Sequence, residues 1–445
     1  MTLSSVAVLC RLWLHPSVER AALDRFRNRQ LRRLIRHAYA NVPHYRDLLD
    51  RHAIRPEDIR SVDDLAAIPV TSRREFQGRA AREVVARNVD PARLIVRRTS
   101  GRSGQPLTIR RTWFEERLLG AFRWRALHAM GWRPTDRHAE IEEVGPPHPH
   151  DSQFAHRALQ GIGLCRQARI DVLQAPDRMR LALRAFGPDI VTGYAGALTR
   201  VAQTMSDADR ATLRVRFAAT HSEVLTPQMR QQIATGFAAP VHEIYDCNEC
   251  NVIAWQCVRS GALHVCDDAV VVEILVDGRP VAPGERGEVV VTSLHSFAMP
   301  IIRYRLGDLV TRGSATCPCG QPFSTLHRIQ GRMADYFPLP GGRLLHPYEI
   351  VAIVGNATPW LREYQLTQER EDLVVLHVVP WRVPSAPEVD DLRTRVARIL
   401  GGDVTLRLEV VAALRVEPHA KFRVCHSMVT SAYDGFDWDQ ATGQR

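Results

Sequence analysis

The segment that decides the fold is Gly187-Pro188-Asp189-Ile190-Val191-Thr192-Gly193-Tyr194. It follows a helical pattern from Met179 to Phe186, and its apolar centre, bounded by Gly and Pro, predicts a short buried strand. A second apolar run, Val215 to Ala219, follows the next helical stretch. Because helices and short strands alternate here, we predict an α/β domain with a mainly parallel sheet.

Other patterns lie on the N-terminal side of this segment. Leu23 to Tyr39 has apolar residues at helical spacing, and Pro43 is expected to end that helix. Thr71-Ser72 is typical of a helix cap. Two β-rich runs, Leu94 to Val96 and Leu107 to Ile109, then flank a loop that is rich in glycine and hydroxyl groups.

On the C-terminal side, Val270 to Val276 and Gly287 to Thr292 predict an antiparallel or barrel-like β subdomain. Farther on, Leu373 to Val379 and Thr405 to Val411 are strand-like, and Glu388 to Leu400 between them is helical. The expected fold is therefore a large N-terminal α/β domain with mixed sheets, followed by a small C-terminal α+β domain. Glycines and prolines cluster at the boundary, so we divide the chain into domains 1–334 and 335–427 and a tail, 428–445, that is poorly ordered or docked.

Composition sets the class of the protein. The 445 residues are 45% hydrophobic and 24% charged, as in ordinary globular proteins. The net charge of +10 is spread along the whole chain, which argues against a nucleic-acid surface. No apolar run approaches 18 residues and Arg11 interrupts the apolar start, so we expect no membrane segment and a cytoplasmic location. Nine cysteines in that compartment indicate free thiols or a metal site.

One basic residue stands apart from all the others. Lys421 is the single lysine among 59 basic residues, and the rest are arginines. Lysine is a compact charge on a flexible stem, and it can reach into a closed site to touch one oxygen. Its retention predicts a chemical role near the end of the chain.

Several further motifs carry chemically useful groups. The loop Thr99-Ser100-Gly101-Arg102-Ser103-Gly104-Gln105-Pro106 could wrap phosphates with its backbone amides and hydroxyls, although it lacks the Gly-Lys-Ser/Thr of a Walker loop. The others are Tyr245-Asp246-Cys247-Asn248-Glu249, Ile302 to Leu309, Arg328 to Asp335, and Ala420-Lys421-Phe422-Arg423.

In this order and at these separations, the five elements resemble the adenylate-forming superfamily. The closer resemblance is to phenylacetate–CoA ligases and coenzyme F390 synthetase-like proteins. His37-Ala38-Tyr39-Ala40-Asn41-Val42-Pro43-His44-Tyr45 and the segment from Gly187 to Tyr194 are also similar to that branch. The resemblance extends from about residue 20 to residue 426.

The resemblance implies the activation of a carboxylic acid by ATP as an acyl-AMP, followed by transfer to the thiol of CoA. Lys421 would bridge the acid and the α-phosphate, and Glu249 would help to bind Mg²⁺. Asp308 would bind the ribose, supported by Arg332, and Tyr245 would lie near the adenine. The remaining predicted residues of the nucleotide site are Thr99, Ser100, Gly101, Ser103, Gly104, Glu223 and Asp246. Tyr194, Gly196 and the region from His148 to Gln153 would form the acid pocket.

The chain departs from the family pattern at several positions, and these departures leave the acyl acceptor open. Gln105 replaces the usual lysine of the phosphate loop, Ser222 replaces a glycine, and Asp246 adds negative charge near the expected phosphates. An amine, a nitrite-like nucleophile or a carrier-protein thiol is therefore an alternative acceptor. A non-catalytic nucleotide- or nucleic-acid-binding protein is the alternative from another class. A homodimer is expected only because similar proteins are often dimers.

A structural Zn²⁺ site is the remaining prediction. Cys317-Pro318-Cys319-Gly320 has two thiols in a tight turn, which is a common half of such a site. Three candidates could supply the other half: Cys257 with His264, Cys247 with Cys250, or Cys266. We favour Cys257 and His264, because Cys247 and Cys250 bracket Glu249 and because F390 synthetase-like proteins tend to carry this set.

Overall fold

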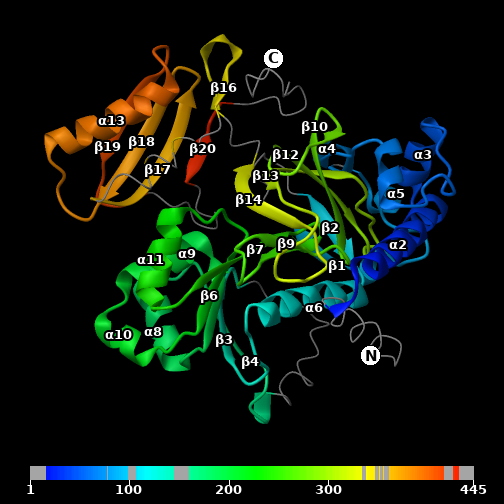
Figure 1. The fold of residues 1–445 in the computed structure, drawn as a ribbon, viewed down its shortest axis with the longest axis horizontal. Coiled ribbons are helices and arrows are strands. Elements are labelled where there is room, and N and C mark those ends of the chain that lie inside the picture. Colours follow the sequence, from blue (N-terminus) through cyan, green and yellow to red (C-terminus); the bar gives the residue numbers. More distant parts are fainter. Residues whose placement is uncertain are drawn as a thin grey trace. The chain divides into compact units, whose positions relative to one another are not determined.

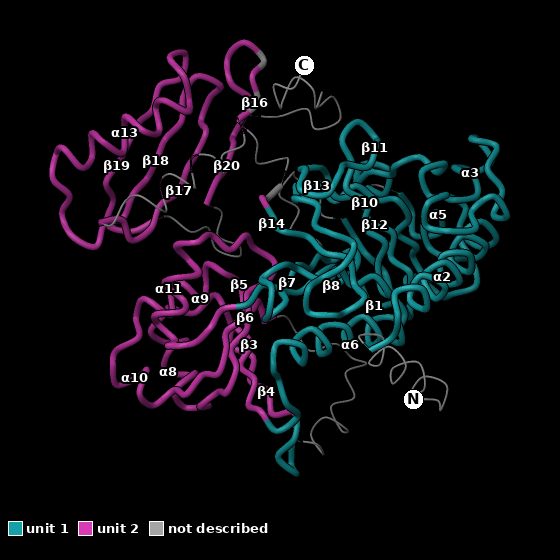
Figure 2. The backbone as a smooth tube through the Cα atoms, viewed as in Figure 1, with its two compact units in different colours: residues 1–135, 147–164, 242–329 teal, residues 136–146, 165–241, 330–445 magenta. Residues whose placement is uncertain are grey.

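The protein is described by a computed structural model that covers residues 17–77, 79–98, 107–144, 160–332, 337–345, 350, 354, 360–414 and 424–429. The chain forms two compact units, each made of segments that are far apart in sequence (Figure 2). Unit 1 comprises residues 1–135, 147–164 and 242–329, and unit 2 comprises residues 136–146, 165–241 and 330–445. The domain boundary at residue 334 stays a prediction, and most of the predicted tail lies outside the described residues.

Unit 1 begins with helices and continues into an antiparallel sheet (Figure 1). Its helices are α2 (Arg20–Asn41), α3 (Pro43–Arg51), η2 (Val62–Ala67), α4 (Arg73–Phe76), α5 (Ala81–Val84), η3 (Pro91–Arg93) and α6 (Trp113–Ala129). Its strands are β1 (Ile95–Arg98), β2 (Thr108–Arg111), β7 (Val241–Cys247), β8 (Asn251–Gln256), β9 (Leu263–Val265), β10 (Val270–Val276), β11 (Arg279–Pro280), β12 (Arg286–Ser293), β13 (Tyr304–Arg312) and β14 (Thr325–Arg332).

Local sequence signals explain the N-terminal elements of unit 1. As predicted, α2 ends just before Pro43, which then occupies the first position of α3, where a missing amide hydrogen has no cost. Ser72 caps α4 through a reciprocal pair with Glu75. Strands β1 and β2 pair antiparallel on either side of the segment 99–106, as the two β-rich runs predicted.

The sheet of unit 1 has the strand order β11-β10-β12-β13-β14-β9-β8-β7. The pairs β10–β12, β12–β13, β14–β9 and β8–β9 are antiparallel, which confirms the predicted antiparallel subdomain. This order brings the loop between β8 and β9 next to the loop between β13 and β14.

Unit 2 contains a four-stranded parallel sheet with the order β6-β5-β3-β4. Its elements are β3 (Arg137–Glu142), β4 (Arg166–Asp171), α8 (Pro176–Phe186), β5 (Ile190–Tyr194), α9 (Ala195–Thr204), α10 (Asp207–Thr212), β6 (Phe217–His221) and α11 (Pro227–Phe237). One face of the sheet packs on α8, α9 and α11 through Ala139, Ile141 and Val191. The opposite face carries His138, Glu140 and Thr192, all buried. The predicted parallel α/β domain is confirmed.

The C-terminal part of unit 2 forms a second sheet, with the order β19-β18-β17-β20. Its elements are β15 (Phe337–Pro338), η5 (Pro340–Gly342), β16 (Leu344–Leu345), β17 (Leu361–Arg370), β18 (Leu373–Pro380), α13 (Ala386–Leu400), β19 (Thr405–Val410) and β20 (Cys425–Ser427). Helix α13 lies along one face of this sheet (Figure 1) and buries Leu392, Val396 and Leu400 against it. The predicted small α+β arrangement is confirmed within a residue or two of the expected bounds.

Candidate functional site

Tyr245 and Asp308 meet inside unit 1, on strands β7 and β13. The Tyr245 hydroxyl donates a hydrogen bond of 2.6 Å to Asp308 Oδ2. Both residues are buried, with 6% and 8% of their surface exposed. Two residues that the sequence assigned to opposite ends of a nucleoside are therefore neighbours, although 63 positions separate them. A carboxylate oriented by a phenol can accept hydrogen bonds from a sugar hydroxyl at its other oxygen.

Glu249 lies in the turn that connects β7 to β8. Its carboxylate is buried and lies 3.5 Å from the hydroxyl of Tyr304, which starts the strand that carries Asp308. The turn thus presents a buried carboxylate that follows the strand of Tyr245 and lies against the first residue of the strand that carries Asp308. Carboxylate oxygens are the protein ligands that Mg²⁺ prefers.

Two arginines that no sequence motif indicated support this turn. Arg123 of α6 forms an ion pair with Asp246, and Arg111 of β2 donates a hydrogen bond to the carbonyl oxygen of Asn248. Arg123 therefore balances the negative charge that Asp246 brings to this region. Residues 123 and 246 are far apart in sequence, and neither lies in a pattern that pairs them, so no sequence signal could have identified the partner.

The predicted acid-binding residues lie in unit 2, where β5 and β6 end. Tyr194 is the last residue of β5, and its ring packs edge-on against His221 of β6, with centroids 5.5 Å apart. Burial, reinforced by the nearby Glu142 carboxylate, raises the pKa of Tyr194 to about 12. The carboxyl ends of parallel strands are where open α/β sheets bind ligands.

Glu223 and Gly196 interact directly at this end of the sheet. The amide of Gly196, in the first turn of α9, donates a hydrogen bond of 2.8 Å to Glu223 Oε2. A carboxylate at a helix N-terminus is favourable because it meets the positive end of the helix dipole. Glu223 was predicted to belong to the nucleotide site, and the contact that the structure describes is this cap of α9.

Ser222, next to Glu223, has a backbone conformation that favours glycine. Its φ is +64°, in the left-handed region, and its hydroxyl lies 3.1 Å from His221 Nδ1. A glycine would adopt this left-handed conformation without strain, which explains why the family pattern has a glycine where this chain has Ser222. For a residue other than glycine the conformation costs about 1 kcal/mol or more.

Four metal-ligating side chains converge in unit 1. Cys257 follows β8, His264 lies in β9, and Cys317 and Cys319 lie in the turn between β13 and β14; their ligand atoms all lie within 4.8 Å of one another. The two Sγ atoms of Cys257 and Cys317 are 3.9 Å apart, and Cys319 Sγ is 3.3 Å from His264 Nε2. A tetrahedral zinc ion with ordinary bond lengths would set these distances at roughly 3.8 and 3.6 Å.

The electrostatics of this Cys/His cluster fit a cation. Burial raises the pKa of the Cys257 thiol, but hydrogen bonds from Ser260 and the nearness of His264 outweigh it and lower the pKa to about 6. Burial, together with the thiols of Cys317 and Cys257, raises the pKa of Cys319 to about 11. Crowded thiols oppose one another's ionisation, and a divalent cation at their centre would relieve that opposition.

The other two candidates for the metal site are placed elsewhere. Cys266 accepts a hydrogen bond of 3.0 Å from Arg125, and it is therefore part of a buried ion-pair cluster with Asp268. The backbone N–H of Cys250 donates a hydrogen bond of 3.3 Å to Cys247 Sγ, in the turn that contains Glu249. Within the described residues, only Cys257, His264, Cys317 and Cys319 gather three or more such groups around one point.

Some predicted residues cannot be located. Arg332 ends β14, but its side chain is outside the described part of the structure. Other predicted site residues lie entirely outside the described part of the structure. They are Lys421, the region from His148 to Gln153, and the predicted phosphate-loop residues Thr99, Ser100, Gly101, Ser103 and Gly104.

Comparisons with known proteins decide between the classes of function considered above. No family model matches the chain. It is 27% identical over 433 residues to a phenylacetate–coenzyme A ligase from Aromatoleum evansii. This match covers 92% of this chain and 94% of that protein. It is 25% identical over 381 residues to the ligase of the same name from Thermus thermophilus, covering 80% of each. The chain is a relative of the phenylacetate–CoA ligases. The predicted resemblance to the adenylate-forming superfamily is confirmed.

Solved structures of acid–CoA ligases share the fold. A 2-hydroxyisobutyryl-CoA ligase, in complex with an acyl-AMP in its postadenylation state, matches with a TM-score of 0.76 at 20% identity, covering 93% of this chain and 91% of that one. An anthranilate–CoA ligase in complex with anthranoyl-AMP matches more distantly, with a TM-score of 0.54 at 13% identity, covering 76% of this chain and 67% of that one. The fold of this phenylacetate–CoA ligase relative is therefore that of the adenylate-forming ligases.

None of the helices that the structure describes combines the length and the apolar character needed to cross a bilayer.

Proposed function

We propose that the protein is an AMP-forming acid–CoA ligase. It activates an aromatic carboxylic acid with ATP and Mg²⁺ and transfers the acyl group to CoA. The likeness to the phenylacetate–CoA ligases over 92% of the chain carries this proposal. The hydrogen-bonded pair of Tyr245 and Asp308 and the buried carboxylate of Glu249, all in unit 1, support it, because they offer donors and acceptors that a nucleotide and a magnesium ion need. A cytoplasmic location, with no nucleic-acid or membrane partner, completes the proposal.

In the proposed mechanism the protein supplies position and charge. Asp308, oriented by Tyr245, would accept hydrogen bonds from the ribose, and Arg332 would reinforce that end. Glu249 would hold the magnesium ion, which neutralises phosphate charge, and the Thr99–Gly104 loop would bind the β- and γ-phosphates. Lys421 would bridge the acid carboxylate and the α-phosphate, and Tyr194 and Gly196 would border the acid.

The function is tested by measuring pyrophosphate release from ATP with a panel of aromatic and small aliphatic acids, with and without CoA. Acid-dependent release together with a CoA-dependent thioester is the expected result. Release without any thioester would instead favour another acceptor, such as an amine or a carrier-protein thiol. Protein that binds ATP and releases no pyrophosphate with any acid would contradict the proposal.

We also propose that Cys257, His264, Cys317 and Cys319 hold a structural zinc ion. Thiolate and imidazole ligands suit zinc, and four protein ligands leave no open position for catalysis. The ion would join the β8–β9 loop to the β13–β14 loop.

Protein purified without chelators is expected to contain about one zinc ion per chain by elemental analysis. Cys317→Ser should lose most of this zinc and lower the melting temperature. Cys250→Ser is the matched control, because Cys250 is a buried thiol outside the cluster and its variant should keep the zinc. Near-stoichiometric zinc in Cys317→Ser, or none in the unaltered protein, would contradict the assignment.

Arg123→Ala is expected to raise the KM for ATP on the order of tenfold, because Asp246 would lose the cation that balances it close to the proposed phosphate site. Steady-state kinetics at varied ATP would measure this effect. The double variant Arg123→Ala/Asp246→Asn removes the negative charge as well and should restore most of the affinity. If the double variant were as weak as the single one, the charge balance would not be the cause.

A further inference from the structure

The segment that follows Lys421 is held by strand β17. Strand β20, which begins four residues after Lys421, pairs parallel to β17 with Leu366 opposite Cys425. The backbone N–H of Leu366 donates a hydrogen bond of 2.8 Å to the carbonyl oxygen of Val424. The backbone N–H of Met428 donates another, also of 2.8 Å, to the carbonyl oxygen of Gln368. The position of β17 therefore determines where residues 424–428, which follow Lys421 in the chain, enter the sheet.

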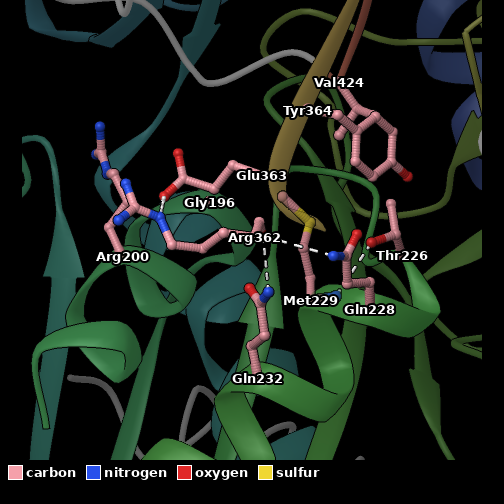
Figure 3. A pocket seen from close by; sticks show the side chains of 10 residues that line it. All are labelled: Gly196, Arg200, Thr226, Gln228, Met229, Gln232, Arg362, Glu363, Tyr364 and Val424. Carbon is pink, nitrogen blue, oxygen red and sulfur yellow. Dashed lines mark hydrogen bonds and ion pairs between the residues drawn. The ribbon is translucent and has the colours of Figure 1, made fainter. Parts of the chain in front are cut away.

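Strand β17 is in turn held by helix α11 of the same unit. The side-chain amide of Gln228 donates to the carbonyl oxygen of Leu361 at 3.0 Å, and that of Gln232 donates to the carbonyl oxygen of Arg362 at 2.8 Å. Gln228 and Gln232 lie four residues apart on α11 and so project from one face of the helix. Figure 3 shows both side chains directed at the start of β17.

Neighbouring contacts orient this pair of glutamines. Gln203 of α9 donates to Gln232 Oε1 at 3.2 Å, which turns the amide nitrogen of Gln232 toward the strand. Tyr364, 5% exposed, is hydrogen-bonded to the side chain of Thr226, the residue that caps α11. A small pocket lies among these groups, and Val424 is also part of its wall (Figure 3).

We propose that Gln228 and Gln232 are positioning residues that hold β17, and through β20 the Lys421 segment, for the acyl-adenylate half-reaction. This inference rests on the proposed function. The acceptors are backbone carbonyl oxygens, whose positions do not depend on the side chains of the strand. The two amide donors therefore fix which residues of β17 lie against α11. The glutamines act through Lys421 and need not touch the substrate. Their loss should therefore affect adenylation and spare the transfer of a preformed adenylate.

The test uses the double variant Gln228→Met/Gln232→Met, which keeps side-chain length and removes both amides, including the Gln232 oxygen that accepts from Gln203. With phenylacetate as the acid, the rate of ATP–pyrophosphate exchange should fall roughly tenfold, as expected for two lost hydrogen bonds. Thioester formation from chemically prepared phenylacetyl-AMP and CoA should change less than twofold. Gln231→Met, exposed on the same helix, is the matched control and should leave both rates unchanged.

Equal losses in both half-reactions, or no loss in either, would overturn the inference. Amide hydrogen exchange gives a readout that does not depend on activity. Amides of β17 and β20 should exchange roughly tenfold faster in the double variant than in Gln231→Met. If the unaltered protein catalyses no exchange with any acid, the proposed function fails, and unchanged amide protection in the double variant would still separately overturn the positioning role.

Discussion

Lys421→Ala is expected to lower acid-dependent pyrophosphate formation by roughly 100- to 1000-fold, which is the effect of removing a preorganised charge from a developing transition state. In the proposed mechanism this lysine is the cation that brings the acid carboxylate to the α-phosphate. Its mobile ammonium group is the one feature that none of the arginines in the chain can supply. The rate is measured by pyrophosphate release at saturating ATP and acid.

Two controls sharpen this prediction. Lys421→Arg keeps the charge, and it should still be slow because a planar guanidinium cannot reproduce the contact of an ammonium group. Arg423→Ala removes a charge two residues away and should stay within about threefold of the unaltered protein, as expected for a charge outside the reaction. If Lys421→Ala and Arg423→Ala lost activity equally, general charge at this end of the chain would explain the effect, and a specific role for the lysine would be excluded.

Asp268→Ala is expected to lower the free energy of unfolding by about 3 to 5 kcal/mol, because it leaves a buried guanidinium without its carboxylate. Asp268 accepts hydrogen bonds of 2.5 and 2.7 Å from Arg125, and both side chains are almost completely buried. The guanidinium of Arg125 also lies over the rings of Trp255 and Phe323. Urea unfolding, with the midpoint and slope compared between variants, measures the loss.

The double variant Arg125→Met/Asp268→Leu separates charge from packing. It removes both charges and fills the space with apolar groups, and it should be much less destabilised than Asp268→Ala. A loss in Asp268→Ala below about 1 kcal/mol, the scale of an exposed ion pair, would contradict the prediction. Trp255 also stacks on His264, with ring centroids 5.6 Å apart, so Asp268→Ala should also weaken retention of the proposed zinc ion.

The local elements of this fold could be predicted because their signals are local. Pro43 separates α2 from α3, Ser72 and Glu75 cap α4, and the alternating helices and strands around Gly187 indicate the parallel sheet of unit 2. The grouping of the chain into units could not be predicted in this way. The C-terminal segment 330–445 belongs with residues 165–241, and no composition shift in the sequence marks that association.

The candidate site shows the same division. Tyr245, Glu249 and Asp308 were identified from motifs; the structure joins Tyr245 to Asp308 by a hydrogen bond and places Glu249 against Tyr304, all within unit 1. The roles of these residues, and of the undescribed Lys421 and phosphate loop, stay predictions. Arg123 and Arg111 were missed, because a supporting arginine has no fixed distance in sequence from the acid or carbonyl that it binds.

The sequence by itself determined the local elements, the order of the motifs, the resemblance to the adenylate-forming ligases and the Cys-Pro-Cys half of the proposed metal site. Each of these depends on neighbouring residues or on their order along the chain. Only the tertiary structure decided that Cys257 and His264 meet Cys317 and Cys319, and that α11 holds β17 through Gln228 and Gln232. These contacts join residues 55 to 133 positions apart. Strand order and register determine such contacts, and they depend on the packing of the whole chain.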